Sequence, residues 1–141
     1  MDTITQRFHQ ALQAFKRSSE SDILNKMQAQ ITPPQIFMLY YINKLGGCKL
    51  TQLAEKMEVK PSAVTVMIDR LEKSGYVTRS HDTVDRRAIL VEATPAGKEV
   101  LEKAIQERNE IIGHYLSRLE QEEARILTEL LEKMMGIEPQ K

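Results

Sequence analysis

The hydrophobic period of this sequence changes at Gly75, and the change limits the possible folds. Before Gly75 apolar residues recur every three or four positions, which is typical of amphipathic helices. After it, YVTRS and RAILVEA alternate or are rich in β-branched residues, and the polar SHDTVD between them predicts a β-hairpin with a loop longer than two residues. Thr94-Pro95 then restarts a helix, with Thr94 as its N-cap. The pattern therefore predicts a mainly helical fold with one small hairpin.

Two short helices precede the hairpin. TQLAEKM reads as a helix of two turns, and Pro61 opens a second helix that ends at Gly75. Within the second helix Val64, Ile68 and Leu71 share one face. Two short helices with a tight connection are a helix-turn-helix candidate. With the hairpin they make a winged helix, in which the second helix enters the major groove of DNA and the hairpin flanks it.

Longer amphipathic helices are predicted on both sides of this module. After a first helix over about Thr3–Ala29, a second begins near Thr32, which can serve as its N-cap, and stops at Gly46-Gly47. Behind the hairpin, apolar stripes run over residues 100–119 and 126–135. A chain with one small module has few surfaces on which to bury so many stripes, and a homodimer packed through helices from both ends of the chain is the economical arrangement. A monomeric helical bundle is the alternative.

Composition excludes several classes of protein. Lys and Arg number 20 and Asp and Glu number 20, so net charge does not indicate a nucleic-acid partner. The single cysteine, Cys48, cannot form a disulfide within the chain, which disfavours a secreted disulfide scaffold. The N-terminus lacks the basic and apolar regions of a signal peptide, and no apolar run approaches the roughly 18 residues of a membrane span. We expect a cytoplasmic protein without a membrane segment.

Motifs of enzymes and of metal sites are absent from the sequence. It contains no glycine-rich phosphate loop, no GxSxG, no HExxH and no paired cysteines. His9, His81 and His114 are scattered, whereas a zinc site needs three or four converging ligands. Lys49 is adjacent to Cys48 and can lower its pKa a little, but a redox role for this thiol is disfavoured. We expect no catalytic residues, no metal and no cofactor.

The second short helix and the hairpin carry the residues that suit DNA. Small residues on the exposed helix face allow close approach, and hydroxyls can bond phosphates or base edges. Two adjacent arginines at the hairpin turn suit the narrow, electronegative minor groove. The alternative is a polar helix face that contacts only water. The candidates are Lys60, Ser62, Ala63, Thr65, Val66 and Arg70 on the helix, and Arg86 and Arg87 on the hairpin.

Over essentially its whole length the chain resembles the MarR family of bacterial transcription regulators. The matching segments are LTQLAEKMEVKPSAVTVMIDRLEKSGYVTR, DTVDRRAILVEATPAG and LEQEEARILTELLEKM. The resemblance implies one MarR-like domain over residues 1–141, with a winged helix-turn-helix at about 32–95 and dimerisation helices at about 1–31 and 95–141. It also implies an obligate homodimer on double-stranded DNA with a palindromic operator. Such regulators usually repress, and a small phenolic or other amphipathic effector often releases them.

The resemblance also assigns roles to single residues. Ser62 and Thr65 match positions that face DNA in the recognition helix, and Thr51 matches the start of the preceding helix, where phosphate contacts are expected. Asp85 matches the acidic residue that steadies the minor-groove arginine, Arg87. Arg86 matches a second basic position of the wing.

This chain departs from the family at two positions and leaves two questions open. Many members carry arginine where it has Val66 and Val84, so we expect a thymine methyl contact in place of one guanine contact, and a less charged wing. A winged-helix module that binds proteins instead of DNA is the rival interpretation. An effector pocket would lie where the dimerisation helices meet the DNA-binding lobe, near residues that are otherwise ordinary core: Phe15, Phe37, Met38 and Tyr41.

Overall fold

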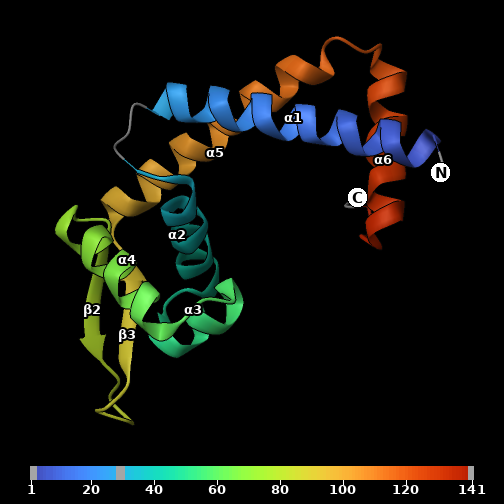
Figure 1. Ribbon diagram of the computed structural model, residues 1–141. Helices are drawn as coiled ribbons and strands as arrows, with labels where there is room; N and C mark the ends of the chain where they lie inside the picture. Colours follow the sequence, from blue (N-terminus) through green and yellow to red (C-terminus); the bar gives the residue numbers. More distant parts are fainter. Residues whose placement is uncertain (1–2, 28–30, 140–141) are drawn as a thin grey trace. The chain divides into compact units, whose positions relative to one another are not determined.

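The computed structural model describes residues 3–27 and 31–139, which form helices and a small antiparallel sheet (Figure 1). The elements are α1 (Thr3–Met27), α2 (Pro33–Leu45), β1 (Cys48–Lys49), α3 (Leu50–Met57), α4 (Pro61–Lys73), β2 (Val77–His81), β3 (Ile89–Ala93), α5 (Pro95–Leu116) and α6 (Gln121–Met135). The predicted fold class, mainly helical with a hairpin wing, is confirmed. Residues 28–30, where the first helix was expected to end, lie outside the described residues.

The chain divides into two compact units. We call Leu24–Gln106 the winged lobe; the terminal unit combines α1 up to Ile23 with the chain from Glu107 onward. The unit boundaries therefore fall inside α1 and inside α5. Within residues 3–27 and 31–139, none of the helices is both long enough and apolar enough to cross a bilayer.

Local signals in the sequence fix the ends of α2. Thr32 Oγ1 accepts a hydrogen bond from the backbone N–H of Gln35 at 3.3 Å, and Gln35 Oε1 accepts one from the N–H of Thr32 at 2.9 Å. This reciprocal pair satisfies two N–H groups that a helix start leaves free. At the other end Gly46 has φ 66°, a left-handed conformation that glycine adopts without a steric penalty. Both predicted boundaries are confirmed.

The sheet has one strand more than the sequence predicted. Strand β3 lies in the middle, paired antiparallel with β2 from Val77↔Ala93 to His81↔Ile89. The extra strand, β1, pairs with β3 through Cys48↔Val91. A strand of two residues is too short to show an alternating pattern, which is why the periodicity predicted only a hairpin.

The start of α3 also differs from the expectation. The helix begins at Leu50, with Lys49 in the extended N-cap position, so Thr51 lies in the first turn and does not cap the helix. The side chain of Gln52 accepts a hydrogen bond from the N–H of Lys49 at 2.8 Å and thereby satisfies that donor. Pairing of Cys48 and Lys49 with β3 fixes the chain just before α3, so the helix starts one residue earlier than TQLAEKM suggested.

One apolar core holds the helices and the sheet of the winged lobe together. Its fully buried side chains come from α2, α3, α4 and both strands of the hairpin, and each contributes the face that its periodicity predicts. They are Met38, Leu39, Ile42, Leu53, Val64, Ile68, Leu71, Val77 and Val91. This core fixes α4 against the base of the hairpin.

The terminal unit leaves much of its apolar surface exposed in the single chain. In α6, Ile126, Leu127, Leu130, Leu131, Met134 and Met135 are each between 43% and 64% exposed. Within the same unit, the hydroxyl of Tyr115 donates a hydrogen bond to Asp22 at 2.7 Å, and its ring packs edge-on against Phe15 at 5.5 Å between centroids. The Asp22 hydrogen bond raises the pKa of Tyr115, because it stabilises the protonated phenol.

Candidate nucleic-acid interface

Helix α4 presents a distinct outer face. Val64, Ile68 and Leu71 are buried in the core, and they come at three- and four-residue steps along one side of the helix. Of the residues between them, Met67 is partly buried against the core, and the others are exposed. The six helix candidates from the sequence all lie on the exposed surface: Lys60, Ser62, Ala63, Thr65, Val66 and Arg70. Val66 is the most unusual of them, because an apolar side chain is 50% exposed at the centre of a polar face.

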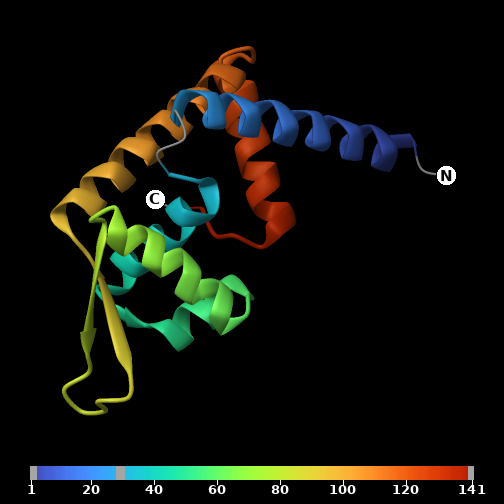
Figure 2. The same cartoon turned by 60° about the vertical axis from the view of Figure 1, so that its left-hand side comes forward.

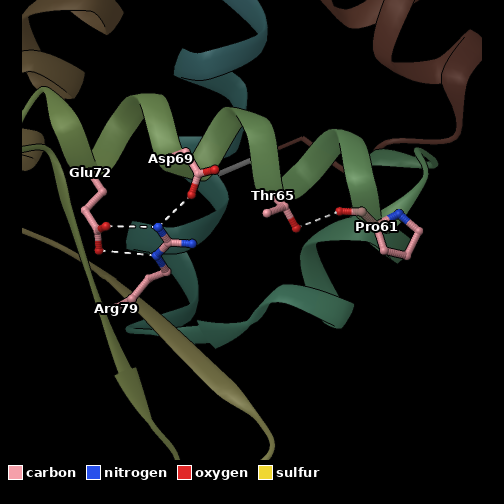
Figure 3. Close-up of polar contacts among 5 residues, drawn as sticks. All are labelled: Pro61, Thr65, Asp69, Glu72 and Arg79. Carbon is pink, nitrogen blue, oxygen red and sulfur yellow. Dashed lines mark hydrogen bonds and ion pairs between the residues drawn. The ribbon is translucent and has the colours of Figure 1, made fainter.

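The hydroxyl of Thr65 is already engaged on its donor side. It donates to the carbonyl of Pro61, one turn earlier, at 3.1 Å (Figure 3). Pro61 lies at the start of α4. While this bond is made, the hydroxyl can only accept hydrogen bonds from an outside partner, and its methyl group remains available for apolar contact. Thr65 therefore suits exocyclic amino groups of adenine or cytosine, or a thymine methyl.

The wing loop between β2 and β3 is ordered by two aspartates. The carboxylate of Asp82 accepts a hydrogen bond from the N–H of Val84, and that of Asp85 accepts one from the N–H of Arg87, each at 3.1 Å. Such bonds two residues ahead stabilise tight turns. Asp85 thus fixes the main chain of Arg87, which refines the sequence-based expectation that it steadies this arginine. This hydrogen bond fixes the backbone of Arg87, and the backbone in turn sets where the guanidinium can lie.

Further contacts close the base of the wing loop. The N–H of Asp82 donates to the carbonyl of Ala88 at 3.0 Å, and His81 Nδ1 lies 3.1 Å from the carbonyl of Arg86. Lys49 Nζ lies 3.8 Å from the carboxylate of Asp82, which connects β1 to the wing. Arg86 and Arg87 are exposed at the tip of the hairpin, which extends beyond the helices of the winged lobe (Figure 2).

An ion-pair network that the sequence reasoning missed lies between α4 and the wing. Arg79 of β2 reaches Asp69 and Glu72 on α4. These hydrogen bonds lower the pKa of Glu72 and raise the pKa of Arg79, since each stabilises the charged form. One signal could have found it: Arg79 follows Val77 at a two-residue step, so a charged side chain occupies the core-facing side of the strand.

The remaining residues predicted from the sequence are Thr51 and the four assigned to an effector pocket. Thr51 is exposed in the first turn of α3, as a phosphate contact requires. Of the residues proposed for an effector pocket, Met38 is fully buried in the core, whereas Phe37 is 46% exposed and packs edge-on against Tyr41 at 4.8 Å. Phe15 belongs to the terminal unit. The structure therefore brings together Phe37 and Tyr41.

The described residues include neither an activated cysteine nor a metal-binding cluster. Cys48 is 2% exposed, and burial raises the pKa of its thiol, which opposes the thiolate that oxidants attack. Its neighbour Lys49 does not reverse this effect. Among the described residues, no group of three or more histidine, cysteine or carboxylate side chains is placed to hold a metal ion.

Comparison with known proteins identifies relatives of this chain. A sequence profile of the MarR family matches residues 31–89. The HTH-type transcriptional repressor MdtR of Bacillus subtilis is 42% identical over 114 residues, which cover 80% of this chain and 74% of that protein. The YusO protein of B. subtilis, known from a crystal structure, is 37% identical in sequence to this chain. The two structures superpose with a TM-score of 0.83, and the alignment covers 96% of each chain.

The fold is also that of a structure determined with DNA. A mutant MarR from Escherichia coli, crystallised with operator DNA, has a TM-score of 0.72 to this chain and is 22% identical. The alignment covers 95% of this chain and 99% of that one. At this identity the likeness concerns the fold.

Proposed function

Because this chain belongs to the MarR family of transcriptional regulators, which are not enzymes, we propose that it is a repressor that binds a palindromic operator as a homodimer. Helix α4 enters the major groove, and Arg86 and Arg87 of the wing enter the adjacent minor groove. The N-terminal turn of α3, with Thr51, lies against the phosphate backbone. The repressor role follows the name of the relative MdtR.

One observation carries this proposal. The same lobe exposes a face of small, hydroxyl-bearing and apolar residues on α4 and two adjacent arginines on a projecting hairpin. The helix face suits base edges, which specify sequence, and the arginines suit the minor groove, where readout is coarse. A protein-binding module without DNA affinity, the rival interpretation, gives no reason for two exposed arginines at the tip.

Dimerisation accounts for the apolar surface of the terminal unit. The six apolar side chains of α6 are exposed in the single chain, although a soluble monomer rarely leaves a contiguous patch of this kind uncovered. A second copy would cover them and would place two winged lobes on the two halves of a palindrome. A homodimer would therefore explain the exposed α6 surface and would match the proposed palindromic operator.

A small phenolic or other amphipathic effector completes the proposal. The aromatic pair of exposed Phe37 and partly buried Tyr41 on α2 is the part of the winged lobe that suits such a ligand, since aromatic rings stack and the Tyr41 hydroxyl can hydrogen-bond. The set expected from the sequence also includes Met38, which is fully buried in the core, and Phe15, which belongs to the terminal unit. Titration of the operator complex with phenolic carboxylates tests this step, and Tyr41→Phe should weaken release if the hydroxyl takes part.

The test of the DNA interface compares two variants that act through different grooves. Footprinting of the purified protein on genomic DNA first supplies the operator. Arg87→Ala should weaken binding to operator and scrambled duplex alike, and should flatten the salt dependence by about one unit for each phosphate ion pair that the substitution removes. Val66→Ala should weaken operator binding selectively and leave the salt slope unchanged. Lys103→Ala, which removes an exposed cation of α5, is the matched control.

Two results would contradict the proposal. If the wild-type protein shows no salt-dependent binding to any duplex, the protein-binding interpretation replaces it. If Arg87→Ala discriminates between operator and scrambled DNA without changing the salt slope, the wing does not act as a minor-groove charge contact.

A further inference from the structure

Arg79 joins the wing to the recognition helix through two carboxylates. Its Nη2 lies 2.6 Å from Asp69 Oδ1 and 2.9 Å from Glu72 Oε1, and its Nε lies 3.3 Å from Glu72 Oε2 (Figure 3). We call these three residues the Arg79 clamp. The two parallel bonds to Glu72 are a bidentate arginine–carboxylate pair, which fixes both distance and orientation. Asp69 and Glu72 lie three positions apart, so they share one face of α4.

The clamp lies where β2 leaves the core. Val77, on the same side of the strand, is 1% exposed and packs in the core. Two residues further on, the Arg79 side chain is 27% exposed, and beyond it Ser80 and His81 are exposed. In Figure 1, β2 and β3 continue past α4 toward the wing tip. The clamp therefore holds the wing to α4 where apolar packing ends.

The charges of the clamp argue against a direct role in DNA binding. One guanidinium faces two carboxylates, so the cluster carries a net charge of −1 and offers no free cation to a phosphate. The arginine fork is planar and rigid, and its bonds raise the pKa of Arg79 further, so it keeps its charge. A residue of this kind acts by holding other groups in place.

We infer that Arg79 is a positioning residue for DNA binding: the clamp sets the angle between α4 and the wing so that Arg87 reaches the minor groove while α4 lies in the major groove. This inference rests on the DNA-binding function proposed above. Simultaneous contact at two grooves gains from a rigid connection, because a wing fixed in advance loses less freedom on binding. Helix α4 itself stays in place through Val64, Ile68 and Leu71.

The experiment removes the clamp without changing the net charge. The double variant Arg79→Gln with Glu72→Gln loses one charge of each sign, which leaves the cluster at −1. Lys98→Gln with Glu99→Gln makes the same change at exposed residues of α5 and serves as the control. Operator affinity is measured for each double variant alone, in combination with Arg87→Gln, and in combination with Val66→Ala.

Coupling between sites is the decisive quantity. We expect clamp removal to weaken operator binding about tenfold or more, and to cost at least about threefold less when Arg87 has already been replaced by Gln. With Val66→Ala the losses should multiply independently, because α4 is held by the core. The control pair should change neither operator affinity nor the effect of Arg87→Gln on it. Arg79→Lys, which keeps the charge and can hold one carboxylate, should give an intermediate loss.

Several outcomes overturn the inference. Clamp and Arg87 losses that multiply independently would assign Arg79 a general structural role. A salt slope that still falls on clamp removal when Arg87 is already Gln would make Arg79 a direct phosphate contact. If the double variant does not fold, the same cycle is run with Arg79→Lys, where independence from Arg87→Gln again overturns it.

A measurement without DNA separates this inference from the proposed function. Hydrogen exchange of the β2 and β3 amides in the free protein should accelerate toward the wing tip when the clamp is removed, and stay unchanged in the Lys98/Glu99 control. If the wild type binds no duplex, the proposed function fails, and faster exchange still supports the clamp as the connection between helix and wing. Unchanged exchange overturns the clamp even where DNA binding is intact.

Discussion

Replacing Gly97 by alanine should destabilise the protein, although glycine-to-alanine changes inside helices usually do the opposite. Gly97 is a buried residue in the first turn of α5. A Cβ atom there would lie 2.1 Å from the carbonyl oxygen of Tyr76 and 3.0 Å from its carbonyl carbon. These are backbone atoms, so no side-chain rotation can relieve the contact. Gly97 therefore allows α5 to approach the chain that enters β2.

The expected magnitude follows from the size of the overlap. Ordinary van der Waals contact begins at 3.4 Å, so the helix and the Tyr76 carbonyl would have to separate by about 1.3 Å. Overpacking of this kind costs about 1–3 kcal/mol. The movement would also stretch the 3.0 Å bond from the N–H of Thr94 to the same carbonyl, which is worth about 1 kcal/mol. Alanine returns at most about 1 kcal/mol of helix propensity, so we expect a net loss of about 2 kcal/mol.

Urea unfolding followed by far-ultraviolet circular dichroism measures this loss, at one protein concentration because dimers are stabilised by mass action. Gly113→Ala is the matched control in the same helix, since an added Cβ there meets nothing within 4 Å. We expect it to raise the free energy of unfolding by about 0.5–1 kcal/mol. A Gly97→Ala protein as stable as wild type would refute the reasoning.

Three further predictions concern single features of the molecule. Cys48→Ser should leave operator affinity and its response to peroxide unchanged. Because burial raises the pKa of Cys48, alkylation of the folded wild type should stay slow as pH rises through the usual thiol range. The urea-unfolded chain should react quickly. If oxidation abolishes DNA binding in wild type but not in Cys48→Ser, the prediction is wrong. Leu127→Glu with Leu131→Glu on α6 should convert dimer to monomer in sedimentation and lower operator affinity, whereas an unchanged mass would remove α6 from the interface. Thr32→Ala should lower the free energy of unfolding by about 1 kcal/mol in urea melts, because it breaks the reciprocal cap of α2; no change would show that water replaces that bond.

The helices and the hairpin could be predicted because their signals are local. Thr32, Pro61 and Gly136 lie at the helix ends where their backbone preferences place them. The buried residues of α4 are the ones that its three- and four-residue spacing indicated. The strand β1 escaped prediction, since two residues have no period and their pairing depends on β3, more than 40 positions later.

For the candidate site, the sequence indicated which residues are exposed on α4 and the wing, but not how the wing is held. The exposed positions are those on the faces of the helix and strands that do not pack in the core. The arginines lie at the hairpin turn because the polar, turn-forming SHDTVD precedes and includes that turn. Whether these residues contact DNA remains a prediction for each of them, to be tested by the variants above.

Sequence alone therefore determined the class of fold and the outward-facing residues, because capping, periodicity and turn formation act over a few neighbouring residues. The family followed from the resemblance of three segments of the chain. Only the tertiary structure decided the contacts between distant segments. Arg79 is ten positions from Asp69 and meets it only because β2 packs against α4. Gly97 contacts the backbone of Tyr76 because α5 returns to the base of the hairpin. Such contacts depend on how whole elements pack, and no local pattern encodes that packing.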